Sequence, residues 1–129
     1  MKEQDRVQLS IYRIKRARET FNEVAILLEN GLWNTAVNRL YYACYYAVIA
    51  LLIRHEINVN THAGVRQMFG LHFVKTGFID SELGRFYSSI FTMRQSADYE
   101  DYLDYSKEDV LDLLESANEL IKRIEELLE

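Results

Sequence analysis

Apolar residues recur every three or four positions along most of the chain, which is the spacing of one face of an α-helix. The sequence has no proline and only five glycines, which favours long helices joined by short connections over strands and tight turns. The pattern predicts five helices, covering residues 7–30, 34–55, 62–76, 81–94 and 107–129.

The second predicted helix is unusual because apolar residues cover nearly all of its faces, through the run "LYYACYYAVIALLI". A helix of this kind belongs at the centre of a bundle. Thr61 is expected to cap the third helix, and Ser106 with Asp109 resembles a capping box at the start of the fifth. We therefore predict an all-α fold, a single domain over residues 1–129 arranged as an up-and-down bundle of four long helices plus one short helix.

The N-terminal segment, the longest apolar run and the cysteine content indicate the cellular compartment. The N-terminal segment "MKEQDRVQLS" is too polar for a signal peptide. The longest apolar run, residues 41–53, is shorter than the roughly 20 residues that a bilayer span needs. The single cysteine, Cys44, has no partner for an internal disulfide. These features predict a cytoplasmic protein without a membrane segment.

Charge is distributed unevenly in a chain whose formal net charge is −5. Residues 1–66 hold nine Lys and Arg against six Asp and Glu, whereas residues 67–129 hold six against fourteen. In one interpretation the first and last helices lie side by side and neutralise each other. In the other, the segment "RIKRAR" (13–18) faces a phosphate, although an acidic chain argues against strong non-specific binding of nucleic acid.

Several kinds of catalytic site are excluded by their missing motifs. The sequence has no Gly-rich phosphate loop, and none of its three histidines follows a glutamate by three residues, which excludes the di-iron pattern of helical bundles. One cysteine and three dispersed histidines make no zinc pattern. We expect neither a metal nor a cofactor.

The remaining candidates for a functional site are polar residues at positions where the helical pattern predicts apolar ones. Arg94 falls on the apolar stripe of the fourth helix, and Asp98 follows one turn later on the same face. A half-buried arginine needs a carboxylate or carbonyl partner, because an unpaired buried charge is costly. Asp98 is the nearest candidate, and Arg39 in the second helix is the other charge with which Asp98 could pair. The structural interpretation is an ion pair that joins two helices.

The tyrosines and a histidine have two interpretations as well. In one interpretation, the paired tyrosines of the second helix fill the core or a dimer interface. In the other, they stack on nucleic acid bases. These tyrosines are Tyr41, Tyr42, Tyr45 and Tyr46. His62, at the start of the third helix, is expected to cap the helix or anchor a loop. The candidate binding residues are Arg39, Tyr42, His62, Arg94 and Asp98.

Three segments in register resemble the HEPN domain family, and specifically its branch of small uncharacterised prokaryotic proteins. They are "AVNRLYYACYYAVIALL" (36–52), "THAGVRQMFGLHFVKTG" (61–77) and "RQSADY" (94–99), followed by a matching terminal helix. The resemblance covers nearly the whole chain. It implies a helical bundle that forms a homodimer, often encoded beside a nucleotidyltransferase and often part of a toxin–antitoxin or other defence system.

Catalytic members of the family are metal-independent RNases, and the resemblance implies where their residues would lie. They carry an arginine followed, after four to six residues, by a histidine near the end of the next-to-last long helix. Arg94 matches the arginine, but the histidine window falls on Tyr99, Glu100 and Asp101. The branch carries the pattern Arg94-x-x-x-Asp98-Tyr99 instead. Arg66 and His72 have the required spacing but lie in the short helix, and we interpret that match as chance.

The favoured hypothesis is a non-catalytic HEPN-type dimer that binds nucleotide or RNA, or a partner protein of the nucleotidyltransferase family. The alternative is a divergent metal-independent RNase toxin with Arg94, Asp98 and Tyr99 at the dimer cleft. A tyrosine is a poor base there, because its ordinary pKa is about 10. A third hypothesis is a scaffold whose only activity is dimerisation.

Overall fold

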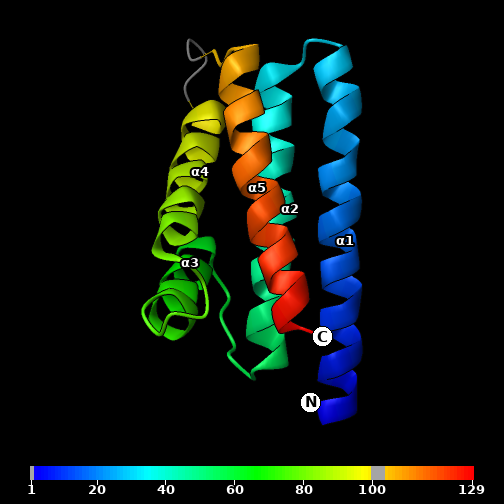
Figure 1. The fold of residues 1–129 in the computed structure, drawn as a ribbon, viewed down its shortest axis with the longest axis vertical. Helices are drawn as coiled ribbons and strands as arrows, with labels where there is room; N and C mark the ends of the chain where they lie inside the picture. Colours follow the sequence, from blue (N-terminus) through cyan, green and yellow to red (C-terminus); the bar gives the residue numbers. More distant parts are fainter. Residues whose placement is uncertain (1, 100–103) are drawn as a thin grey trace.

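The structure is a computed structural model that describes residues 2–99 and 104–129, without the side chains of residues 97–99. Its helices are α1 (Glu3–Glu29), α2 (Trp33–Arg54), α3 (His62–Phe69), α4 (Ser81–Tyr99) and α5 (Lys107–Leu127), with a π-helical turn, η1 (Gly70–Val74), after α3 (Figure 1). The described residues contain no strand. The predicted all-α class is confirmed.

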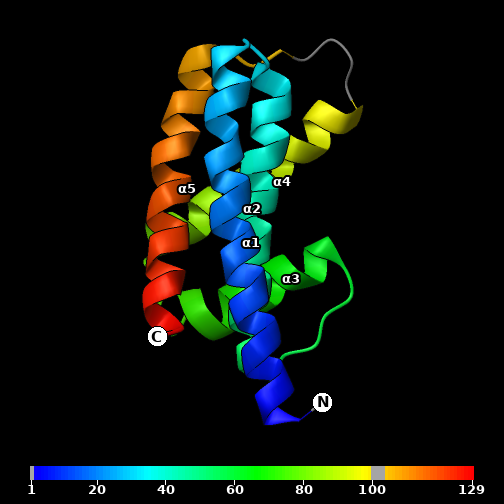
Figure 2. The same ribbon diagram turned by 90° about the vertical axis from the view of Figure 1, so that its right-hand side faces the viewer.

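The long helices alternate in direction, as predicted for an up-and-down bundle. In Figure 1, α1 and α4 run upwards, α2 and α5 run downwards, and both chain ends lie at the lower end of the bundle. The short α3 and η1 lie across the lower part of the bundle rather than along it. Figure 2 shows that the beginning of α3 and the end of α4 reach the same side of α2. This side holds the candidate site.

The core is built around α2, as its all-round apolar pattern predicts. Leu40, Tyr41 and Leu51 of α2 have no exposed surface, and α1, α4 and α5 bury residues against them, including Val24, Ile90 and Leu120. By length and composition alone α2 is apolar enough to cross a membrane, but 61% of its most apolar window is buried inside the bundle. A core helix passes the same test.

The predicted caps are confirmed. The Thr61 hydroxyl accepts a hydrogen bond from the backbone N–H of Gly64 at 2.9 Å. The Ser106 hydroxyl accepts from the N–H of Asp109 at 3.2 Å, while the Asp109 carboxylate accepts from the N–H of Ser106 at 2.9 Å. This reciprocal pair satisfies donors that the first turn of α5 would otherwise leave open.

The third helix differs from the prediction in its second half. The sequence pattern predicts one helix through residue 76, but the α-helix ends at Phe69 and continues as η1, in which the N–H of Lys75 donates to the carbonyl of Gly70 at 2.9 Å. Phe69 and Phe73 are both buried in this arrangement. Burial of two aromatic rings against the bundle therefore accompanies the wider turn.

The uneven charge of the chain is resolved partly by packing between its ends. Arg18 of α1 donates to Glu125 of α5 at 2.6 Å and to Asn118 at 2.7 Å, so the basic first helix and the acidic last helix are paired as the first interpretation predicts. Arg16 pairs with Glu19 inside α1. Arg13, from the same basic segment, instead faces α2 and contributes to the electrostatics of Tyr45.

The contact of α4 with η1 gives a testable prediction. A Cβ added at Gly84 would lie 2.8 and 2.9 Å from the two Cγ atoms of Val74, a side chain that is stiff at χ1. Overpacking of this kind costs about 1–3 kcal/mol, which exceeds the gain of about 1 kcal/mol from replacing glycine in a helix. We expect Gly84→Ala to lower the free energy of unfolding measured with urea.

The matched control is the double variant Val74→Ala/Gly84→Ala, in which the clashing methyl groups are gone. Its free energy of unfolding should exceed the value obtained by adding the two single effects. A stabilised Gly84→Ala protein would show that α4 does not pack tightly on η1.

Candidate functional site

Arg94 lies on the tyrosine face of α2, where it contacts two aromatic rings. Its Nη2 donates a hydrogen bond to the Tyr42 hydroxyl at 3.0 Å. Its guanidinium carbon lies 5.3 Å from the centre of the Tyr41 ring and 5.5 Å from that of Tyr42, within the range of cation–π attraction. The side chain is half-buried. The two rings and the hydrogen bond hold the guanidinium in place at the edge of the core.

His62 reaches the same tyrosines from the first position of α3. Its Nδ1 and the Tyr41 hydroxyl form a hydrogen bond of 2.7 Å, and its ring stacks on Tyr45 with centres 4.3 Å apart and an angle of 13° between planes. It also meets the edge of Tyr42, with centres 5.9 Å apart. His62 thus anchors α3 to α2, as the sequence predicts, but it does so beside Arg94.

The resulting cluster consists of one cation, one imidazole and three phenols, which we call the Arg94–His62 cluster; its members are Tyr41, Tyr42, Tyr45, His62 and Arg94. They come from α2, α3 and α4, which meet on the side of the bundle described above (Figure 2). Tyr41 is buried, whereas the other four are half-buried. The cluster is therefore partly open to solvent.

Burial and charge set the protonation of the cluster. Burial, followed by the positive charge of Arg94, lowers the pKa of His62 from its usual value of 6.5. Burial raises the pKa of Tyr41 to about 12. Burial is also the main cause of the raised pKa of Tyr45, with Tyr42 adding to the shift and Arg13 opposing it. At neutral pH the imidazole is neutral, and the phenols of Tyr41 and Tyr45 keep their protons.

These protonation states define what the cluster can do chemically. A guanidinium that remains charged can bind a phosphate by two parallel hydrogen bonds. A neutral imidazole can accept a proton, and the half-buried tyrosine and histidine rings offer faces on which a base can stack. The described residues contain no group of three or more His, Cys, Asp or Glu side chains placed to hold a metal ion.

The structure places the other predicted site residues as follows. Arg39 donates to Glu23 of α1 at 2.8 Å, so its ion pair joins α1 and α2 and lies apart from the contacts of the Arg94–His62 cluster. Asp98 and Tyr99 belong to the last turn of α4, which is longer than predicted. Their side chains lie outside the described residues, as do Glu100 and Asp101, on which the family's histidine window also falls.

The sequence identified Arg94, Tyr42 and His62 separately but gave no reason to place them together. What it missed is the hydrogen bond between Tyr41 and His62. The available signal was a tyrosine in the middle of an all-apolar helix, because a buried hydroxyl requires a partner. A histidine at the start of the next helix is a natural partner for it.

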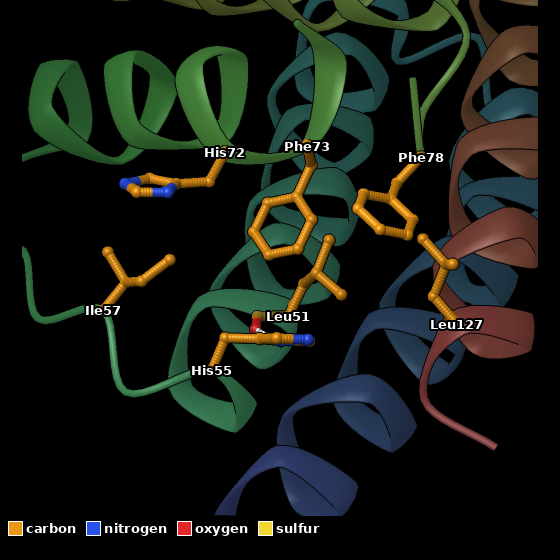
Figure 3. A pocket seen from close by; sticks show the side chains of 7 residues that line it. All are labelled: Leu51, His55, Ile57, His72, Phe73, Phe78 and Leu127. Carbon is orange, nitrogen blue, oxygen red and sulfur yellow. Dashed lines mark hydrogen bonds between the residues drawn. The ribbon is translucent and has the colours of Figure 1, made fainter. Parts of the chain in front are cut away.

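A separate cavity lies at the opposite end of α2, near the C-terminus (Figure 3). It has a volume of about 460 Å³ and is lined mainly by apolar side chains, with His55 and His72 on two of its sides; the others are Leu51, Ile57, Phe73, Phe78 and Leu127. Arg66 lies on another side of α3, above the ring of Phe91. Arg66 and His72 therefore face different cavities, in agreement with a chance match to the RNase spacing.

Comparisons with known proteins bear on the family. A model of the HEPN domain matches residues 11–127. A protein of Thermotoga maritima named "UPF0332 protein" is 39% identical over 118 residues, which cover 92% of this chain and 89% of that protein. Two proteins of Methanocaldococcus jannaschii carry the names "Putative toxin MJ0605" and "Putative toxin MJ0142". The first is 42% identical over 67% of this chain and 64% of its own length, and the second is 32% identical over 89% and 78%.

The electrostatics of the cluster predict how His62 titrates. Its pKa should lie below 6.5 in a pH titration followed by NMR, with the signal assigned from a His62→Gln variant. Arg94→Gln should raise the pKa of His62, but not fully to 6.5, because burial is the larger cause. An unchanged His62 pKa in Arg94→Gln would show that the two side chains do not interact.

The same shift makes stability depend on pH. The unfolded chain binds a proton at His62 near pH 6.5, whereas the folded chain binds it only at lower pH. The stabilising effect of a neutral His62 is thus present above pH 6.5 and is lost as the pH falls towards the folded pKa. The pH dependence of unfolding in this window should be weaker in His62→Gln than in the unmodified protein.

Proposed function

The chain belongs to the HEPN domain family, and from that premise we propose that it binds RNA or nucleotide phosphate as a component of a toxin–antitoxin-like system. The observation that carries the proposal is the fixed, half-buried Arg94 guanidinium beside half-buried aromatic rings. The names of the two Methanocaldococcus jannaschii relatives support the toxin–antitoxin context.

The argument for a phosphate ligand starts from the orientation of Arg94. The Tyr42 hydroxyl occupies one Nη2 donor, and the rings of Tyr41 and Tyr42 restrict the plane of the guanidinium. A pre-oriented guanidinium loses less entropy when it binds, so more of its hydrogen-bond energy appears as affinity. Phosphate is the anion that matches this planar donor pattern in a nucleotide or in RNA.

The argument for a base rests on the rings next to that guanidinium. Tyr42, Tyr45 and His62 are all half-buried, so part of each is open to a ligand. Stacking on such rings tolerates any base and contributes about 1–3 kcal/mol per base in proteins that bind single strands. The proposal is therefore binding without base sequence preference.

We also propose that the protein acts as a homodimer with a partner of the nucleotidyltransferase family, in the cytoplasm. The support for a dimer is that Tyr42, Tyr45 and Tyr46 line one side of a central helix and are only half-buried within one chain. The cytoplasmic location is supported by the single buried thiol of Cys44.

The binding proposal is tested by removing the guanidinium. Arg94→Ala should weaken the binding of a fluorescently labelled oligouridylate of about ten nucleotides by roughly tenfold or more, since a hydrogen bond to a charged group contributes about 1.5–3 kcal/mol. Fluorescence anisotropy measures the affinity, and circular dichroism confirms the fold.

The matched control is Arg39→Ala, which also removes one arginine near α2 but breaks only the pair with Glu23. Its affinity should change little. Equal losses of affinity in the two variants would show that the effect comes from overall charge and not from a contact with Arg94. An Arg94→Ala protein that fails to fold would show that Arg94 has a structural role. If the unmodified protein binds no oligouridylate or nucleotide, only the scaffold hypothesis remains.

A second candidate function is metal-independent cleavage of RNA, and one observation favours it: His62 stands beside Arg94 although no histidine follows Arg94 at the family spacing. In the tautomer with the proton on Nδ1, His62 donates to Tyr41 and Nε2 can accept a proton. We propose that Nε2 takes the proton of a ribose 2′-hydroxyl, whose oxygen attacks the adjacent phosphorus.

The rest of the reaction needs no reagent other than water. The bond from phosphorus to the 5′-oxygen of the next nucleotide breaks, that oxygen takes up a proton from water, and the other product ends in a 2′,3′-cyclic phosphate. The proton held by His62 then neutralises the hydroxide, which returns the imidazole to its neutral form. Arg94 stabilises the charge that develops on the phosphate. In this alternative Asp98 and Tyr99, which follow Arg94 by about one turn of α4, would join Arg94 at the dimer cleft.

Cleavage would have a clear signature. We expect RNA cleavage by the purified protein to survive EDTA and to be lost, by at least about 100-fold, in His62→Gln, because general acid–base catalysis contributes about 10²–10⁴-fold. Gel analysis of a labelled RNA measures the rate. His72→Gln is the matched control and should cleave normally. Cleavage that persists in His62→Gln would contradict this role, and no cleavage at all would leave the binding proposal standing alone.

A further inference from the structure

A groove runs between α4 and the segment formed by α3 and η1; most of its lining surface is apolar, and two arginines and three serines are among the residues that line it. Its volume is about 530 Å³. It is lined by two arginines, three serines and two glycines, together with three apolar side chains; the polar and small residues are Arg66, Arg85, Ser81, Ser88, Ser89, Gly70 and Gly84. Unlike the cavity near the C-terminus, the groove carries two guanidinium groups, which can bind an anionic ligand.

The charges of the groove are available to a ligand. Among the residues that the structure describes, neither Arg66 nor Arg85 forms a salt bridge within the chain. Arg85 is exposed, and Arg66 is half-buried with its guanidinium carbon 4.6 Å from the centre of the Phe91 ring. The serine hydroxyls add neutral donors. Ser81 stands at the first turn of α4, where the backbone N–H groups also favour an anion.

The groove is linked to the Arg94–His62 cluster by contacts between side chains, which pass through two buried rings. Arg66 covers the ring of Phe91, which meets the edge of Tyr41 with centres 6.1 Å apart, and Tyr41 contacts Arg94. Arg66 also follows His62 by one turn of α3. Arg85 and Arg94 are separated by nine residues of α4, which is about 13.5 Å along the helix and about half a turn around it, so a strand that contacts both also passes around α4.

We propose that this groove binds the phosphodiester backbone of single-stranded RNA, so that one strand contacts Arg94, Arg66 and Arg85 in succession. The inference rests on the proposed function, because it extends the ligand of the Arg94–His62 cluster from one phosphate to a chain of phosphates. A mononucleotide at Arg94 would leave the two groove arginines unused. An acidic peptide would match the arginines but would not use the aromatic faces next to Arg94.

The overall charge of the protein strengthens this choice of path. With a net charge of −5, most of the surface repels a polyanion, and attraction is confined to places where cations are not neutralised within the chain. Arg16, Arg18 and Arg39 are each paired with a glutamate. Among the residues that the structure describes, Arg66 and Arg85 form no salt bridge and both line the groove. Arg13 also forms none, but it acts on Tyr45, on the α1 side of the cluster.

The decisive variant is Arg85→Ala, because Arg85 is exposed and makes no contact with the cluster that would disturb the fold. Its binding to an oligouridylate of about ten nucleotides should weaken about fourfold at 0.15 M salt, and the slope of log K against log salt should fall by about 0.7, the values for loss of one phosphate contact on a single strand. Arg85→Glu should weaken binding further. Binding of uridine 5′-monophosphate, measured by calorimetry, should not change.

Arg16→Ala is the matched control, since it removes an arginine of α1 that lies outside the groove and should leave the salt slope as it is. An unchanged oligouridylate affinity and slope in Arg85→Ala, with binding lost in Arg94→Ala, would overturn the groove proposal and keep the proposed function. If neither Arg85→Ala nor Arg94→Ala weakens the binding of the oligouridylate, both the groove proposal and the proposed function are overturned. Tighter binding of an oligoglutamate peptide than of the oligouridylate, sensitive to Arg85→Ala, would show that the groove serves an acidic protein segment instead.

Discussion

The hydrogen bond between Tyr41 and His62 is the interaction on which the candidate site depends. Tyr41 is buried in the centre of α2, and a phenol in that position loses its water partners without losing its need for them. His62 supplies a partner at 2.7 Å. Because His62 is the first residue of α3, this bond holds the first turn of the short helix against α2 and keeps an imidazole at the surface of the core.

Arg94 enters the same arrangement from α4, so an arginine and a histidine from two different helices contact the same tyrosines. The Arg94 guanidinium and the His62 imidazole both contact Tyr41 and Tyr42, so they lie near each other without a fixed spacing in the sequence. The positive charge of Arg94 also keeps the pKa of His62 low, which favours the neutral form that can accept a proton. The proposed binding and the proposed cleavage thus draw on the same two side chains, and a His62 variant distinguishes them experimentally.

The ion pairs of the chain explain where its surface is acidic, which its net charge alone does not. Arg18 and Arg39 are used to join helices, which leaves negative charge in excess over much of the surface. The cations that face the cluster and its neighbouring groove, Arg66 and Arg85, lie on α3 and α4. An acidic protein can therefore present a local basic path, and net charge alone does not exclude a nucleic acid ligand.

The sequence by itself determined the helices, their order and the central place of α2, because periodicity and capping are local properties. The reciprocal bonds of Ser106 with Asp109 and the burial of Leu40 and Leu51 agree with it in detail. It also marked Arg94, Tyr42 and His62 one at a time. Local pattern could not pair Arg39 with Glu23 or replace the end of the third helix by η1, since both depend on neighbours from other helices.

Only the tertiary structure decided that His62 and Arg94 share one site. They are separated by most of α3, η1 and α4 along the chain, and no periodicity connects residues on helices that cross. Their meeting depends on the angle at which α3 lies across the bundle and on the side of α2 that α4 covers (Figure 2). Those angles are set by how large side chains such as Tyr41, Phe69 and Tyr87 fill the space between helices, which is a property of the whole core.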